Sequence, residues 1–313
     1  MIQVQNVQQQ PSQDVREQLY SQLEDYMGLS STKKKMDSSE KSGGTTLKRK
    51  SSEQSSSSSN SKALSKNTLA IKVNGKTIKG SAQNIVGRVV EAEMGASFRE
   101  EALKAQAVAA YTYIRYNNQK GTIPSLPAKS GVSAKVEDAV EQVIGEALYY
   151  QGEYINATYC ASNAGNSVDS ENVWGGYLPY LRSVESPGDT TLKAYGAVKR
   201  FSEEEIAQYI EENLDVDPYD YSDPDEWFED EEYINGRYVD SIRVCGRRLS
   251  GREVREELME FALPSVAFEV EYDDGEFIFT TYGYGHGVGM SQQGADYFAQ
   301  RGWDYEEILT HYY

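Results

Sequence analysis

The chain has 313 residues, of which 39% are hydrophobic and 26% charged, and its formal net charge is −18. Such an excess of acidic residues argues against nucleic-acid binding over much of the surface, because that needs a basic surface to neutralise the phosphates. Two cysteines (Cys160 and Cys245) and two histidines (His286 and His311) are too few for a disulfide scaffold or a cysteine-rich zinc site. No apolar run approaches the roughly 18 residues that a membrane-spanning helix needs.

Residues 1–66 are predicted to be a disordered tether. Within them, residues 33–66 consist mainly of serine, lysine and glycine and follow neither a helical nor a strand period. Such a stretch buries too little apolar surface to offset the entropy lost on ordering. A short helix over about residues 15–27 is the one element we expect before it.

Residues 67–313 are predicted to form one α+β domain, in which helices interleave with antiparallel β-hairpins. Turn dipeptides predict three hairpins, at residues 74–75, 151–152 and 274–275. Apolar periodicity and capping boxes predict helices over 97–116 (opened by Ser97 with Glu100) and 136–147, and after Ser250 and Asp304. This order disfavours a parallel, doubly wound sheet.

Residues 203–233 form an acidic insertion, with fifteen acidic residues and no lysine or arginine. Its first part predicts a helix, because Ser202 and Glu205 form a capping box and apolar residues follow at helical spacing. The remainder has two prolines and alternating acids and aromatic residues, which favours a surface loop. A calcium site is the alternative, but the segment lacks the glycine-centred loop and terminal glutamate of an EF-hand.

Two glutamates, Glu91 and Glu93, lie among apolar residues just before the helix expected at 97–116. Burial would raise the pKa of such a carboxyl group, while a helix N-terminus would favour the ionised form by about 0.3–1 kcal/mol. Since one pKa unit corresponds to about 1.4 kcal/mol, real burial outweighs the helix dipole. A glutamate that is partly protonated near neutral pH can give a proton to a leaving oxygen and take one back. The simpler interpretation is a pair of ordinary acids at a helix start.

The sequence YGYGHGVGMSQQGA, residues 282–295, surrounds His286 with glycines. Its glycine spacing fits neither a Rossmann fingerprint nor a P-loop. Its polar residues, with nearby Tyr282, Tyr284 and Trp303, would suit a sugar, which needs hydroxyl partners and flat apolar faces. A purely structural histidine is the alternative. Similarly, the small polar residues 160–167 (CASNAGNS) either line a binding site or form a simple turn.

Together, these segments resemble the stage II sporulation protein D family (SpoIID/LytB) of bacterial cell-wall proteins. The resemblance covers about residues 68–313. It is carried by Glu-Met followed by EALKAQAVAA, by the small-residue loop with VW and PYL downstream, by LSGREVRE, and by GYGHGVGMSQQGA with a terminal IL-x-H-Y-Y. It implies a SpoIID-like catalytic domain, a lytic transglycosylase that acts on peptidoglycan glycan strands and prefers strands whose stem peptides have been removed.

The resemblance implies that Glu93, the glutamate directly before Met94, is the catalytic residue, with Glu91 as the fallback. Glu93 would protonate the glycosidic oxygen and then take the proton of the C6 hydroxyl of N-acetylmuramic acid, leaving a 1,6-anhydro end. The tethered hydroxyl replaces the second carboxylate that ordinary glycoside hydrolysis needs. The candidates for sugar binding are Gln106, Tyr111, Ser162, Tyr284, His286, Ser291 and Gln292.

The chain also departs from the family pattern. Tyr111 stands where members usually have arginine, and residues 117–133 lack the histidine and cysteine of the zinc loop that some members carry, so we expect no metal or other cofactor. The usual N-terminal signal or anchor is not visible, so we expect either a truncated start or an anchor on a partner. The resemblance implies an extracytoplasmic location, in the cell wall or between the mother-cell and forespore membranes, and work during engulfment beside the amidase/endopeptidase called stage II sporulation protein P.

Two other functions stay open at this point. One is a non-catalytic glycan-binding enhancer of a cell-wall amidase, as the LytB-type members are named; the loss of arginine at Tyr111 and the acidic insertion leave room for it. The other is a thiol hydrolase using Cys160 and His286. The second is disfavoured because no cation near Cys160 in the sequence would lower its pKa.

Overall fold

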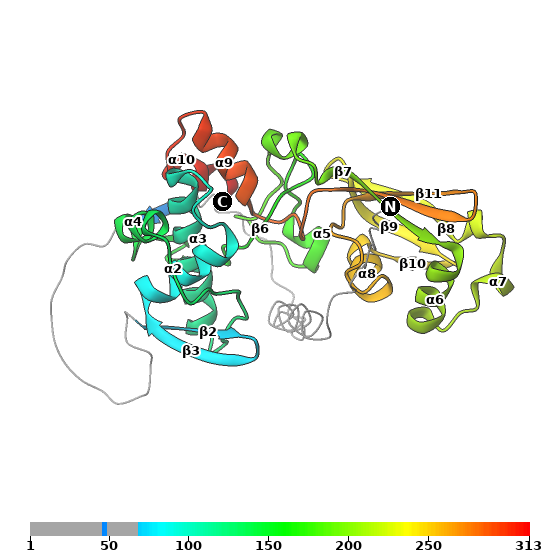
Figure 1. The fold of residues 1–313 in the computed structure, drawn as a ribbon, viewed down its shortest axis with the longest axis horizontal. Coiled ribbons are helices and arrows are strands. Elements are labelled where there is room, and N and C mark those ends of the chain that lie inside the picture. The colour runs from blue at the N-terminus through cyan, green and yellow to red at the C-terminus, as the bar shows by residue number, and fades with distance from the viewer. Residues whose placement is uncertain (1–45, 49–67) are drawn as a thin grey trace, which may run out of the picture.

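The computed structural model describes residues 46–48 and 68–313. These residues form an α+β fold of helices and antiparallel sheets, as the sequence predicts. Figure 1 shows a helical lobe at one end of the molecule and a sheet-rich lobe at the other, joined by irregular chain. The predicted tether and the helix expected near 15–27 lie outside the described residues, except for 46–48.

The helical lobe combines segments from both ends of the described chain. It contains β2 (Thr68–Val73), β3 (Lys76–Ser81), α2 (Ala82–Glu93), α3 (Glu100–Gln119), α4 (Ala134–Val143), β4 (Ala147–Tyr150), β5 (Glu153–Tyr154), β13 (Met290–Ser291), α9 (Gln292–Gln300) and α10 (Tyr305–Tyr312). The short strand β1 (Thr46–Lys48) pairs antiparallel with β4, so three residues of the predicted tether form a sheet edge. Three short elements lie between the lobes, namely β6 (Tyr159–Cys160), α5 (Ser170–Trp174) and η2 (Pro187–Thr191).

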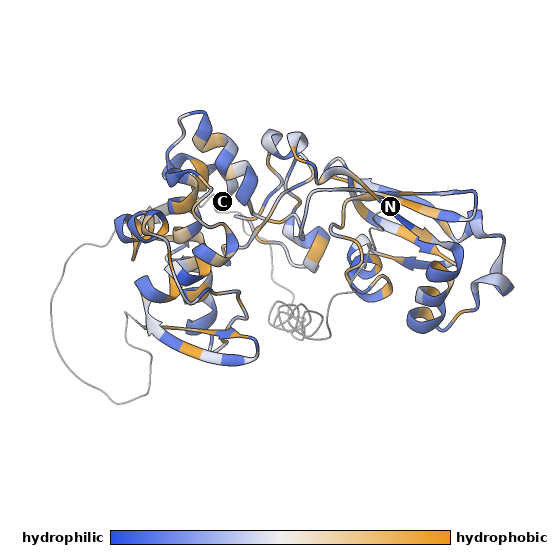
Figure 2. Cartoon of the chain, in the orientation of Figure 1, coloured by the Kyte–Doolittle hydropathy of each residue, from blue (hydrophilic) through white to orange (hydrophobic). Residues whose placement is uncertain are grey.

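The sheet-rich lobe holds two three-stranded antiparallel sheets, in the orders β11-β12-β7 and β10-β9-β8. Its elements are β7 (Tyr195–Ser202), α6 (Glu203–Leu214), α7 (Pro218–Tyr221), η3 (Pro224–Glu226), β8 (Phe228–Ile234), β9 (Tyr238–Val244), β10 (Arg247–Leu249), α8 (Gly251–Glu253), the π-helical η4 (Val254–Leu258), β11 (Phe268–Asp273) and β12 (Glu276–Tyr282). All three predicted hairpins are present, with left-handed backbone at Asn74, Gln151 and Asp274 and at the glycine after each. In the β2–β3 hairpin, β3 is mostly polar (Figure 2), whereas β2 carries the buried apolar run Leu69–Ile71.

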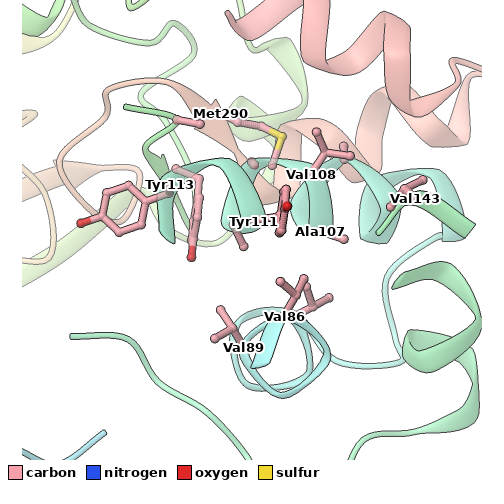
Figure 3. Packing of buried hydrophobic residues seen from close by; sticks show 14 of the residues in the cluster. Val86, Val89, Ala107, Val108, Tyr111, Tyr113, Val143 and Met290 are labelled. Carbon is pink, nitrogen blue, oxygen red and sulfur yellow. The ribbon is translucent and has the colours of Figure 1, made fainter. Parts of the chain in front are cut away.

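Helix α3 is the centre of the helical lobe. Fifteen of its twenty residues are buried, on every side of the helix, so it is a core helix and not a surface one. Figure 3 shows Val86 and Val89 of α2 on one side of α3 and Met290 on the other. Five of its twenty residues are alanines, whose small side chains let the neighbouring elements approach closely.

The start of α3 differs from the prediction. The helix begins at Glu100, and Ser97 does not cap it. The backbone N–H of Arg99 donates instead to Oδ1 of Asp296, 2.7 Å away on α9, a partner that local sequence cannot reveal. Glu91 and Glu93 therefore lie at the C-terminal end of α2. There the helix dipole opposes a negative charge, the reverse of the sequence-based expectation.

Other helix predictions are met in part. The capping boxes at Ser250 and Asp304 are present, and the Ser250 box opens a short α-helical turn that continues as the π-helical η4. The helix predicted over 136–147 ends earlier, at Val143, because Ala147 already pairs in β4. Helix α9 lies in the glycine-rich C-terminal segment, where the sequence pattern predicts no helix.

The acidic segment 203–233 is more ordered than predicted. Helix α6 is capped by Ser202 and Glu205, as expected. The loop predicted after it was wrong, because Phe228–Ile234 forms β8 and Trp227 is fully buried. The ring of Trp227 stacks on Phe277 with 5.4 Å between centroids. Most of the acidic side chains are exposed to solvent, so their mutual repulsion is small. The aromatic residues of the same segment can therefore be buried and stabilise the fold.

This packing predicts that the acidic segment contributes to the stability of the fold. Trp227→Ala should lower the free energy of unfolding by about 3–5 kcal/mol, because it removes a large buried ring. Urea denaturation measures the change, with Tyr233→Ala as the control, since Tyr233 of the same segment is 42% exposed. Equal stability of the two variants would mean that the segment is not packed as described.

Candidate active site

Glu93 is the last residue of α2, and its carboxyl group is enclosed by protein although part of the residue's surface stays accessible. Burial raises the pKa of Glu93 to about 7, and a hydrogen bond from Gln292 lowers it only in part. In that bond Nε2 of Gln292 lies 3.1 Å from Oε2 of Glu93. Both the acid and the carboxylate are therefore present at neutral pH, which a residue that gives and takes back a proton requires.

Glu91 has a different environment. Its Oε2 accepts hydrogen bonds from the hydroxyl and the backbone N–H of Ser133, at 2.7 and 3.1 Å, and the ammonium of Lys129 lies 3.8 Å from Oε1. These bonds to Ser133, assisted by Lys129, lower the pKa of Glu91. A carboxylate held ionised at the start of α4 is a poor proton donor, so the geometry favours Glu93 over the fallback.

Gln292 reaches Glu93 because α9 begins beside it. The helix is capped by Ser291, whose hydroxyl accepts the N–H of Gly294 at 2.8 Å and donates to Oδ1 of Asp189, also at 2.8 Å. Ser291 is fully buried, so its hydroxyl serves this internal link, although the family resemblance implies that Ser291 is a sugar ligand. The fully buried Asp189 thus supports the residue next to Gln292, and no sequence motif had pointed to it.

Two buried polar groups near Glu93 form no hydrogen bond of good geometry with the described residues, although they lie close enough to interact with each other. They are the side-chain amide of Gln106, on α3, and the hydroxyl of Tyr159, on β6. Burial, and after it the negative charge of Glu93, raise the pKa of Tyr159 well above its usual range, so the hydroxyl remains a donor. Unpaired buried polar groups are costly, and a site that retains them is suited to a polar ligand. Gln106 was a predicted site residue; Tyr159 was missed.

His286 orders the loop before β13. Its Nδ1 accepts the N–H of Val288 at 3.0 Å, so the neutral ring carries its proton on Nε2. Burial, and next the positive charge of Arg255, lower the pKa of His286 to about 3, which keeps the ring uncharged. The ring packs against Trp174, with 5.2 Å between centroids. Its connection to Glu93 runs through Tyr159, whose backbone bonds to His286 and whose side chain adjoins the acid.

The glycines around His286 are explained by close packing. Gly289 has a φ of +75°, and a Cβ there would lie 2.2 Å from the carbonyl oxygen of Thr158. At Gly287 a Cβ would lie 2.4 Å from the ring of Tyr238. The glycine-rich strip therefore packs against Thr158, the residue before Tyr159, and against Tyr238 of β9.

The remaining predicted sugar ligands are placed differently from one another. Tyr284 is 58% exposed, and its backbone pairs with that of Ser162, which is buried. Tyr111 is buried, and its hydroxyl accepts a hydrogen bond from Nε of Arg115 at 3.1 Å. Arg115 thus brings a guanidinium group to Tyr111 from one helical turn further along α3. Its Nη2 is buried without a partner in the described part of the chain.

Cys160 does not have the environment of a nucleophile. It is buried, and burial followed by the charge of Asp189 raises its pKa to about 12, which disfavours the thiol-hydrolase alternative. Cys160 and Cys245 are both free. Within residues 46–48 and 68–313, no three or more His, Cys, Asp or Glu side chains are grouped as metal ligands, and no helix has the length and hydropathy to span a bilayer.

The Asp189 network predicts a dependence of stability on pH. Burial raises the pKa of Asp189 from 3.8 to about 6, so the folded state binds this proton more tightly than the unfolded state. Relative to Asp189→Asn, the wild type should therefore lose stability as the pH rises from 3.8 to about 6. Urea unfolding at several pH values measures the difference. The exposed control Asp240→Asn should track the wild type, and a pH-independent difference for Asp189→Asn would contradict the account.

Comparisons with known proteins point to one family. A family model described as "Stage II sporulation protein" matches residues 79–150. Stage II sporulation protein D of Bacillus subtilis (strain 168) is 32% identical over 273 residues, which cover 76% of this chain and 76% of that protein. Its counterpart in Bacillus amyloliquefaciens is 32% identical over 269 residues, 76% of this chain and 75% of that protein. The amidase enhancer of Bacillus subtilis (strain 168) is 27% identical over 285 residues, 72% of this chain but 39% of that protein. The chain belongs to the stage II sporulation protein D family.

Proposed function

We propose that this protein is a lytic transglycosylase that cleaves peptide-stripped glycan strands of peptidoglycan between N-acetylmuramic acid and N-acetylglucosamine. The observation that carries the proposal is Glu93, a carboxyl group with a pKa raised to about 7 by burial. The amide of Gln106 and the hydroxyl of Tyr159 support it, because they form no hydrogen bond of good geometry with the described residues and could bond to a sugar beside the acid.

In the proposed reaction, protonated Glu93 gives its proton to the glycosidic oxygen, and the bond from this oxygen to C1 of N-acetylmuramic acid breaks. The C6 hydroxyl of the same sugar attacks C1 and passes its proton to the Glu93 carboxylate. This step forms the 1,6-anhydro ring and restores the acid. One carboxyl group is enough because the nucleophile is already tethered to the reacting sugar, which gives it a high effective concentration. This agrees with the environment of Glu91, which is bound to Ser133.

The site of action follows from the substrate. Peptidoglycan lies outside the cytoplasmic membrane, so the protein would act in the cell wall or between the mother-cell and forespore membranes during engulfment. There it would work beside the amidase/endopeptidase called stage II sporulation protein P, which removes the stem peptides and so supplies the stripped strands.

A second function is favoured by one observation, the similarity to a protein named amidase enhancer. In that case the same residues would bind a glycan strand and present it to a cell-wall amidase, and no glycosidic bond would break. The two functions differ in whether Glu93 transfers a proton.

The first test is substitution of the acid. Glu93→Gln should lower the rate of anhydro-end formation by about 10²–10⁴-fold, because it removes the proton donor and changes the shape of the side chain little. Glu91→Gln is the matched control and should retain most of the activity. The measurement is mass spectrometry of the products formed from purified, peptide-stripped strands.

The outcomes separate the candidate functions. Strand binding by the wild type without any anhydro product would support the enhancer. Activity that survives in Glu93→Gln but is lost in Cys160→Ser would overturn the proposal in favour of thiol chemistry.

The second test is the pH profile. Because the reaction begins with protonated Glu93, kcat/KM should be highest below the pKa of about 7 and fall about tenfold per pH unit above it. The hydrogen bond from Gln292 favours the carboxylate, so Gln292→Leu should raise the pKa of Glu93 and move this decline to higher pH. A decline at the same pH in both proteins would argue against Glu93 as the titrating group.

A further inference from the structure

The buried carboxylate of Asp189 is joined to Glu93 by a chain of contacts that the proposed reaction does not use. Its Oδ1 accepts a hydrogen bond from the hydroxyl of Ser291 at 2.8 Å. The next residue, Gln292, donates through Nε2 to Oε2 of Glu93 at 3.1 Å. We propose that Asp189 is a positioning residue for the reaction, because it holds the start of α9 so that Gln292 stays bonded to Glu93. This inference rests on the proposed function.

Three hydrogen-bond donors from three segments account for a carboxylate at position 189. Its Oδ2 accepts the hydroxyl of Ser186 at 2.7 Å and the backbone N–H of Asn163 at 2.9 Å, while Oδ1 accepts the hydroxyl of Ser291. An asparagine has a single acceptor oxygen, so it could not satisfy donors on both sides. Through Asn163, the small-residue loop at 160–167 takes part in holding this carboxylate.

Two glycines allow η2, which carries Asp189, to pack directly on α9. A Cβ at Gly188 of η2 would lie 2.4 Å from the Cβ of Tyr297 on α9. A Cβ at Gly294 of α9 would lie 2.3 Å from the hydroxyl of Ser186, which donates to Asp189 at 2.7 Å. The segment around Asp189 is therefore in close contact with the first two turns of α9, where the helix approaches the acid.

Positioning and direct electrostatics would change the pKa of Glu93 in opposite directions. A negative charge on Asp189 acting at a distance disfavours the Glu93 carboxylate, whereas the hydrogen bond from Gln292 favours it. Removing Asp189 therefore raises the pKa of Glu93 if Asp189 acts through Gln292, and lowers it if Asp189 acts only as a charge. The hydroxyl of Tyr159, which faces Glu93, is uncharged at neutral pH because burial raises its pKa. For the same reason the titratable groups that face Asp189 are uncharged, namely Cys160, Tyr238 and Tyr312.

The test measures the titration of Glu93 in the full chain, by NMR of isotope-labelled glutamate side chains, with Glu93→Gln to identify the signal. Asp189→Ala should move the midpoint of this titration to higher pH by roughly 0.5–1 units, because a hydrogen bond to the carboxylate is lost. Gln292→Leu should shift it in the same direction. In the double variant the two shifts should not add, since both changes remove the same bond. The decline of kcat/KM with pH should move by the same amount.

Ser291→Ala is a milder change that breaks the same link, and it should give the same upward shift even where Asp189→Ala does not fold. Because it also removes a helix cap, the matched control is Ser202→Ala, which removes the cap of α6 in the sheet-rich lobe and should leave Glu93 and cleavage unchanged.

A midpoint for Glu93 that stays the same or falls in these variants, or shifts that add in the double variant, would overturn the positioning role. The NMR measurement needs no substrate, so it tests Asp189 separately from cleavage. If the midpoint rises as expected but the wild type forms no anhydro ends, the proposed function fails while the link from Asp189 to Glu93 holds.

Discussion

The contact between Glu93 and Gln292 is the constraint on which the site depends. It joins the end of α2 to the start of α9, 199 residues further along the chain. Both helices pack against buried α3, and Asp189 accepts a hydrogen bond from Ser291, the residue that caps α9. A partly protonated carboxyl group therefore results from the packing of the whole helical lobe.

Helix geometry explains why two glutamates in one short sequence have opposite properties. Residues two positions apart on an α-helix point in directions about 200° apart. Glu91 therefore faces Ser133 and Lys129, which favour its ionised form, and Glu93 faces the interior and Gln292. The C-terminal dipole of α2 acts on both, so it does not distinguish them. The two glutamates differ because Glu93 is buried and Glu91 accepts hydrogen bonds from Ser133.

The parts of the fold that local chemistry determines could be predicted from the sequence. The hairpin at Asn74-Gly75 needs only the left-handed backbone of two adjacent residues, and the capping box at Asp304 needs only residues within one turn. Glu93 and Gln106 were found through a family motif. The parts that failed depend on distant partners. Asp296 sets the start of α3, Phe277 buries Trp227 in the acidic segment, and Tyr159 enters the site because β6 pairs with β13.

Binding and cleaving a glycan strand make separate demands on such a protein. Binding needs hydrogen-bond donors and aromatic faces along the surface. It does not require any one group to have a particular pKa. Cleavage needs one carboxyl group that is protonated when the sugar arrives and ionised after the bond breaks. Only the packing around that group, here the burial of Glu93 opposed by a single amide, supplies this property. An enhancer and an enzyme can therefore share much of a binding surface and differ in whether one carboxyl group is buried enough to stay partly protonated.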